Sequence, residues 1–135
     1  MSEDMTQKKA RVAADVLAQF CAKIADDKMA EDVLIIPLAG KTSVADYMVI
    51  ATANSMPHLT ALASHIERGV REEHQLRVYS SDGRSETGWI VLDYVTVVVH
   101  LMLPEVRVRY GLESLWSGSP SPAAMGELES HVRRG

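Results

Sequence analysis

The chain has 135 residues, of which 47% are hydrophobic and 24% charged, and its formal net charge is −4. These values are typical of one globular domain, and they exclude nucleic-acid binding driven by a broadly basic surface. A single cysteine excludes an internal disulfide, and the longest apolar run, residues 97–103 with His100 inside it, is too short to cross a bilayer. We therefore expect a cytoplasmic protein with no membrane segment.

The first predicted element is an amphipathic helix over residues 6–28. Its apolar side chains recur at helical spacing, which places them on one face: Val12, Val16, Leu17, Phe20 and Ile24. After residue 28 the apolar residues no longer recur at helical spacing. Residues 33–38 form a short apolar run that predicts a strand buried on both faces, with Pro37 near its end because proline lacks an N–H. A loop at 40–43 leads into a second predicted strand, 46–53.

A second helix is predicted to begin after Ser55 and to continue to about residue 74. Ser55 is a favourable N-cap, and Pro57 suits the first turn. The side chains expected to point inward are Leu59, Leu62, Ile66 and Val70. We expect a third strand at 76–80, followed by an exposed polar loop at 81–87.

Residues 89–94 and 96–103 are predicted to pair as a β-hairpin. The connecting residues Tyr94, Val95 and Thr96 contain no Gly, Asn or Asp. Tight hairpin turns require positive φ, which valine disfavours, so a nonstandard turn or a small bulge is expected. A short helix begins at Pro104 and ends before Gly111, and residues 112–116 add one more turn. We expect the domain to span residues 1–117 and residues 118–135 to form a flexible tail rich in Ser, Gly, Pro and Ala.

The predicted element order is α-β-β-α-β-β-β-α, which indicates a single α/β domain with a mixed five-stranded sheet flanked by helices. This pattern resembles the nucleotidyltransferase superfamily, whose enzymes hold metal ions with two carboxylates spaced two residues apart on a strand and a third nearby. Asp46 and Asp93 match the first and third positions, but the second is Met48. A thioether is a poor Mg²⁺ ligand, so we expect no catalytic residues, no metal and no cofactor.

For several residues the sequence is consistent with both a structural role and a role in binding a partner. Asp46 is either a carboxylate that bonds the 40–43 loop or a recognition residue, and Asp93 is either a turn residue or a surface contact. His100 lies inside an apolar strand, which favours a core or interface role over metal binding. Trp89 starts a strand after a polar loop, so it is expected near the sheet rim as an interface anchor, with burial in the core as the alternative. Tyr94, Tyr110 and Trp116 raise the same question.

Three segments, 45–55, 88–94 and 97–116, together resemble the ribosomal silencing factor family, also called the Iojap family. The matching residues are Ser43, Asp46, Tyr47, Asn54, Ser55, Gly88, Trp89, Asp93, Tyr94, His100, Pro104, Glu105, Arg107, Tyr110, Leu115 and Trp116. The chain departs from the family at Val95-Thr96, where Gly-Asp is usual, and at Ser80-Ser81, where Glu-Gly is frequent.

The resemblance implies a binding protein rather than an enzyme. Family members bind the large ribosomal subunit through a basic protein of the L-fourteen family, block joining with the small subunit, and form homodimers. It implies no membrane partner and no sequence-specific binding of nucleic acid. The residues implied to contact the partner are Trp89, Asp93, Tyr94, Asp46, His100, Glu105, Arg107 and Tyr110.

Overall fold

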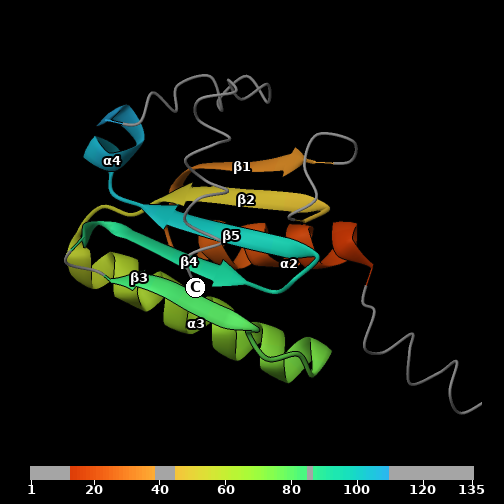
Figure 1. Ribbon diagram of the computed structural model, residues 1–135. Coiled ribbons are helices and arrows are strands. Elements are labelled where there is room, and N and C mark those ends of the chain that lie inside the picture. The colour runs from red at the N-terminus through yellow and green to blue at the C-terminus, as the bar shows by residue number, and fades with distance from the viewer. Residues whose placement is uncertain (1–12, 39–44, 85–86, 110–135) are drawn as a thin grey trace, which may run out of the picture.

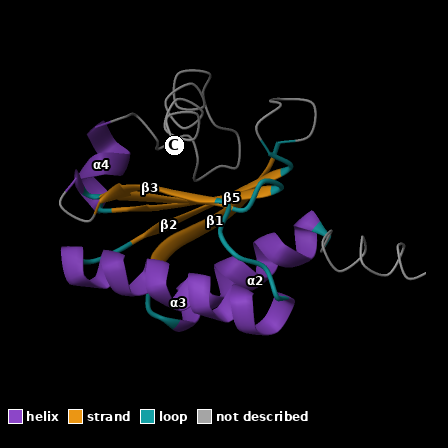
Figure 2. Ribbon diagram, turned by 60° about the horizontal axis from the view of Figure 1, so that its bottom comes forward, coloured by secondary structure: helices purple, strands orange, loops and turns teal. Residues whose placement is uncertain are grey.

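The computed structural model describes residues 13–38, 45–84 and 87–109, and it shows one sheet with helices on both sides (Figure 1). Helices α2 (Ala14–Asp27) and α3 (Met56–His74) cover one face of the sheet. The short helix α4 (Pro104–Arg109) lies on the other side, as Figure 2 shows. The prediction of a single α/β domain with a mixed sheet is confirmed. The strands are β1 (Glu31–Pro37), β2 (Tyr47–Thr52), β3 (Ser80–Arg84), β4 (Trp89–Asp93) and β5 (Val97–Met102).

The strands lie in the spatial order β1-β2-β5-β4-β3. Only the central pair, β2 and β5, is parallel; the β1–β2, β4–β5 and β3–β4 pairs are antiparallel. The parallel pair requires a long connection between its strands, and α3, β3 and β4 supply it. The β4–β5 hairpin agrees with the prediction.

The start of α3 forms as the sequence predicts. The Ser55 Oγ accepts a hydrogen bond of 3.2 Å from the His58 backbone N–H, and Pro57 occupies the first turn. The helix ends at His74, and Gln75 closes it in the left-handed conformation with a φ of 55°. Helix α2 ends at Asp27, close to the predicted end, while residues 6–12 of the predicted helix lie outside the described ranges.

Strict alternation along the strands sorts their side chains into two apolar clusters, one on each face. The helix-side cluster joins the sheet to α2 and α3, and its strand residues include Val49, Ala51, Ile90, Leu92, Val97, Val99 and Leu101, with Tyr94 from the turn after β4. The predicted inward residues of α3 are all buried there. The opposite cluster, which we call the α4-side cluster, contains Ile36, Leu38, Met48, Ile50, Trp89, Val91, Val98, Met102 and Val106. Neighbouring residues along a strand therefore point into different clusters, and the position of a residue in this alternation decides which cluster its side chain joins.

Two strand predictions are wrong. The third strand runs over Ser80–Arg84 and not over 76–80, so most of the predicted 81–87 loop is a strand paired with β4. Strand β1 is not buried on both faces, because it lies at the sheet edge and leaves Ile35 38% exposed. Pro37 does lie at the end of β1, as predicted.

The β4–β5 connection is the nonstandard turn that its sequence predicts. Val95 adopts a φ of 74°, a conformation that is costly for a β-branched residue. The Asp93 Oδ1 accepts a 2.7 Å hydrogen bond from the Val95 N–H, and the Tyr94 N–H donates to the Val97 carbonyl at 2.8 Å. These bonds hold the turn in a conformation that valine would otherwise avoid.

Candidate functional site

The residues predicted to contact a partner lie at two opposite ends of the sheet. Asp93 pairs with Val98 next to the β4–β5 turn, and the Asp46 backbone bonds Thr96 at the same end. Trp89 pairs with Met102 at the far end of the hairpin, where α4 follows. The predicted set is therefore not one patch. Tyr110 lies outside the described ranges.

Trp89 begins β4 at the end of the sheet, as predicted, but it is buried with 3% of its surface exposed, so the alternative interpretation of burial in the core is the correct one. It packs in the α4-side cluster, and its Nε1–H donates a 3.0 Å hydrogen bond to His100 Nδ1. The two rings are tilted with centroids 5.8 Å apart. Because Nδ1 accepts this bond, the neutral His100 ring carries its proton on Nε2. The pair is a buried polar contact within an apolar cluster, which orients both rings.

Tyr94 points to the other face and is also buried, so it does not offer a surface contact. It belongs to the helix-side cluster, and its Oη has no hydrogen-bond partner among the described residues. Burial raises the pKa of the Tyr94 hydroxyl, and the neighbouring Cys21 and Glu67 raise it further. Tyr94 therefore stays neutral over the physiological range.

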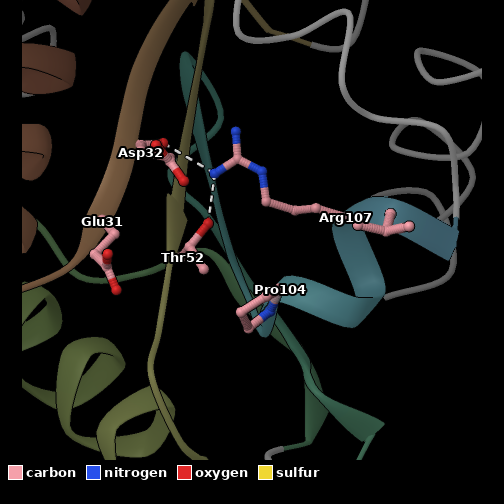
Figure 3. Close-up of a pocket in the computed structure, with 6 residues that line it drawn as sticks. Glu31, Asp32, Thr52, Pro104 and Arg107 are labelled. Atoms are coloured by element: carbon pink, nitrogen blue, oxygen red, sulfur yellow. Dashed lines mark hydrogen bonds between the residues drawn. The ribbon is translucent and has the colours of Figure 1, made fainter.

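Arg107 joins three segments that are distant in sequence (Figure 3). It extends from α4 across the end of the sheet, where its Nη1 donates to the Asp32 carbonyl at 2.9 Å and to the Thr52 Oγ1 at 2.6 Å. Its side chain is almost fully buried. Burial lowers the pKa of the guanidinium, and the charge of Asp32 opposes that change. Arg107 fixes α4 to β1 and β2.

The remaining predicted residues are accessible. Asp46 and Glu105 are exposed, and Asp93 is half-buried with its carboxylate bonded to the Val95 N–H. These three carboxylates can meet a partner directly. Trp89, Tyr94, His100 and Arg107 are instead buried and leave almost no side-chain surface exposed.

The geometry disfavours metal chemistry at the positions that resemble a nucleotidyltransferase site. Met48 is fully buried in the α4-side cluster, and Val98 lies between it and Asp93 across the sheet. Within the described ranges, no group of three or more His, Cys, Asp or Glu side chains could hold a metal ion. No helix in these same ranges is long and apolar enough to cross a membrane.

Sequence reasoning missed the partners of Arg107 and the role of His58. The His58 ring accepts from the Asn54 N–H at 2.9 Å, and its Nε2–H donates to the Lys28 carbonyl at 2.8 Å. It therefore links the end of α2 to the start of α3. One signal was present: His58 falls at the third residue after the Ser55 N-cap, within the first turn, where side chains reach back to the preceding loop.

Comparison with known proteins gives a consistent result. The family model described as "Ribosomal silencing factor during starvation" matches residues 10–134, well past residue 117. A protein named ribosomal silencing factor from Zymomonas mobilis is 36% identical over 102 residues, which is 76% of each chain. A protein of the same name from Bacillus subtilis is 35% identical and covers 77% of this chain and 87% of its own.

A mouse protein named "Mitochondrial assembly of ribosomal large subunit protein 1" is 32% identical over 65% of this chain and 40% of its own length. Among solved structures, one from Chromobacterium violaceum superposes with a TM-score of 0.73 at 27% identity, covering 82% of this chain and 91% of that one. One from Bacillus halodurans gives a TM-score of 0.66 at 28% identity, covering 76% and 94%. Each of these two structures thus shares its fold with at least three quarters of this chain.

Proposed function

The chain belongs to the ribosomal silencing factor family, and we propose that it represses translation by binding the large ribosomal subunit. Its docking partner there is the L-fourteen family protein, and the bound factor sterically blocks joining of the small subunit. The observation that carries this proposal is the family match over residues 10–134, which includes every described element.

Two physical features support a binding role. The chain has a net charge of −4, and its exposed carboxylates include Asp46 and Glu105. An acidic surface is attracted to a basic ribosomal protein, and this raises the rate of encounter. Steric occlusion needs only a rigid folded body on the subunit face, and the sheet with its two apolar clusters supplies one.

The alternative, an enzyme on a nucleotidyltransferase-like fold acting on a nucleotide, has less support. The buried Met48 occupies the position where such an enzyme needs a carboxylate oxygen. We propose that the fold resembles those enzymes while the chain has no catalytic activity. We also propose that the protein is cytoplasmic and homodimeric when free, and that residues 118–135 are dispensable for docking.

The test is cosedimentation of the purified protein with large subunits, followed by addition of small subunits. We expect the protein to sediment with large subunits and to lower the amount of joined ribosomes, because occupancy of a shared face competes by mass action. An unrelated acidic protein of similar size serves as the control. Equal amounts of joined ribosomes with and without excess protein would contradict the proposal.

A further inference from the structure

The β4–β5 turn lies at the end of the sheet opposite α4 (Figure 1). The Tyr79 N–H donates to the Asp93 carbonyl at 2.7 Å, next to this turn. On the other side of the turn, the Asp46 N–H donates to the Thr96 carbonyl at 2.9 Å. Val95 lies in the turn itself, between Asp93 and Thr96 in the chain. We call Tyr79, Asp93, Val95 and Asp46 the turn-end row.

Val95 exposes an apolar side chain at an energetic cost. Its φ of 74° is unfavourable for a β-branched residue, whereas glycine adopts this conformation without strain. The residue is 56% exposed, so burial in the core does not offset the cost. Backbone strain of this kind is concentrated at functional sites. Contact with a partner would use the side chain that the turn holds in this strained conformation.

Tyr79 adds a second exposed apolar side chain beside Asp93. It is 75% exposed, the largest fraction among the exposed large hydrophobic residues that the structure describes. Its neighbour Val78 packs against the helix-side cluster, and its own N–H is bonded to the end of β4, so its backbone is fixed. Tyrosine is enriched at protein interfaces, because a rigid ring gives a large contact area at little cost in conformational entropy.

The turn-end row carries negative charge. Asp46 is exposed, and the half-buried Asp93 uses its Oδ1 to accept from the Val95 N–H. Arg77, the basic residue nearest to Tyr79 in sequence, instead lines a pocket beside α3. Carboxylates repel the phosphates of RNA and attract basic side chains, so the row fits a protein surface rather than a nucleic acid.

We propose that the turn-end row, and not the α4 end, is the surface with which the chain docks on a basic protein of the large ribosomal subunit. Apolar side chains of that protein pack against Tyr79 and Val95, and its lysine or arginine side chains pair with the two carboxylates. This inference rests on the proposed function and deepens it, because the residues predicted to contact the partner are divided between the two ends of the sheet.

The first test separates contact from stability at Val95. Val95→Gly removes the side chain and relieves the backbone strain, so the variant should melt no lower than wild type. It should nevertheless bind large subunits about threefold more weakly in a cosedimentation titration, because the partner loses an apolar contact. Val108→Ala is the matched control: that valine is 60% exposed at the α4 end, and its loss should leave binding unchanged.

Two further pairs of variants test the ring and the charge. Tyr79→Ala should weaken binding about three- to tenfold, whereas Tyr79→Phe, which keeps the ring, should bind nearly as wild type. Asp46→Asn should weaken binding about two- to fivefold, and high salt should reduce this loss. Its control is Glu105→Gln, which removes an exposed carboxylate at the α4 end and should have little effect.

The outcomes separate this inference from the proposed function. If wild type sediments with large subunits while Val95→Gly and Tyr79→Ala bind as tightly as their controls, the turn-end row is not the docking surface, although the proposed function stands. If Val108→Ala and Glu105→Gln are the weaker binders, the α4 end docks instead. Failure of wild type to sediment with large subunits overturns both proposals. If the turn-end variants change only the sedimentation of the protein alone, the row contacts a second copy of the chain and the inference is wrong.

Discussion

The two faces of the sheet are stabilised by different kinds of contact. On the helix side, the cluster between the strands and helices α2 and α3 is built from apolar side chains such as Leu62, Ile66 and Val99. On the α4 side, apolar residues surround directional polar contacts, namely the Trp89–His100 bond and the bonds of Arg107. Burial of apolar area is tolerant of small shifts, whereas buried hydrogen bonds require fixed geometry.

This difference indicates that the two faces serve different purposes. The helix side contributes stability by burying apolar surface, and residues there can be exchanged for others of similar volume. The α4 side fixes the position of one short helix and of one strand end. A partner that recognises α4 or the β1 edge therefore depends on the polar contacts of that face.

Replacing Trp89 with alanine should have the largest effect. Removing a buried tryptophan costs about 3–5 kcal/mol of folding stability, because it leaves a cavity and removes the donor that bonds His100 Nδ1. Trp89→Phe keeps most of the ring and should lose about 1–3 kcal/mol, chiefly for the missing N–H donor. Chemical denaturation of both variants measures these losses.

Binding to large subunits by the same variants separates the two interpretations of Trp89. A loss of stability with binding retained at low temperature assigns Trp89 to the fold. A Trp89→Ala protein as stable as wild type would contradict its burial in the α4-side cluster.

Arg107→Ala should have the next largest effect, about 2–3 kcal/mol of folding stability, because a charged donor is lost and the buried Thr52 Oγ1 loses its bond to it. Arg109→Ala is the matched control: it is exposed at the end of the same helix and should change stability by no more than about 0.5 kcal/mol. Hydrogen exchange of the α4 amides should rise in the first variant only. Equal losses in the two variants would show that Arg107 does not hold α4 in place.

The sequence predicts the helix-side face well because its signals are local. Period-3.6 spacing in α3 assigns its inward residues, and the continuous apolar runs of β4 and β5 indicate buried strands, without knowledge of the tertiary structure. The unusual turn at Val95 is also predictable, since it follows from the residues that the turn lacks. The third strand was predicted at 76–80 instead of Ser80–Arg84 because the sequence of β3, with Gly83 and several polar residues, carries no apolar pattern. It is held by backbone pairing with β4.

The polar contacts of the α4 side could not be predicted for a different reason. The partners of Arg107 lie 55 and 75 residues away, and one of them is a backbone carbonyl that only a β1 irregularity presents. A basic residue in a short helix otherwise indicates a solvated side chain. For Trp89 and His100, the hairpin was predicted, but their contact depends on the register set at the Val95 turn.

The stability of the protein at alkaline pH should depend on the burial of Cys21 in the helix-side cluster. Burial raises the pKa of this thiol from 9.0 to about 12. Above pH 9 the unfolded chain releases the proton while the folded chain keeps it, so the stabilisation is complete below pH 9 and is lost as pH rises towards 12. The expected slope is about 1.4 kcal/mol per pH unit for this group.

Denaturation curves at pH 8, 9, 10 and 11 measure that slope, and Cys21→Ala should reduce it. Tyr94, whose pKa is also raised, adds to the slope in the same direction at higher pH, so Tyr94→Phe provides the comparison. A slope that is identical in wild type and Cys21→Ala would show that the thiol is accessible to water in the folded chain.

The smallest effect is expected at His58, where the helix side has a polar contact of its own. Its ring bonds the Asn54 N–H and the Lys28 carbonyl, so it joins the ends of two helices that otherwise meet through apolar side chains. His58→Ala should cost about 1 kcal/mol, because the site is half-buried and water can replace part of each bond. His65→Ala, two turns along α3, is the control and should change stability less, since the described residues give its ring no hydrogen bond. If His58→Ala instead costs as much as Arg107→Ala, directional contacts fix the helix side as strongly as the α4 side, and the contrast between the two faces fails.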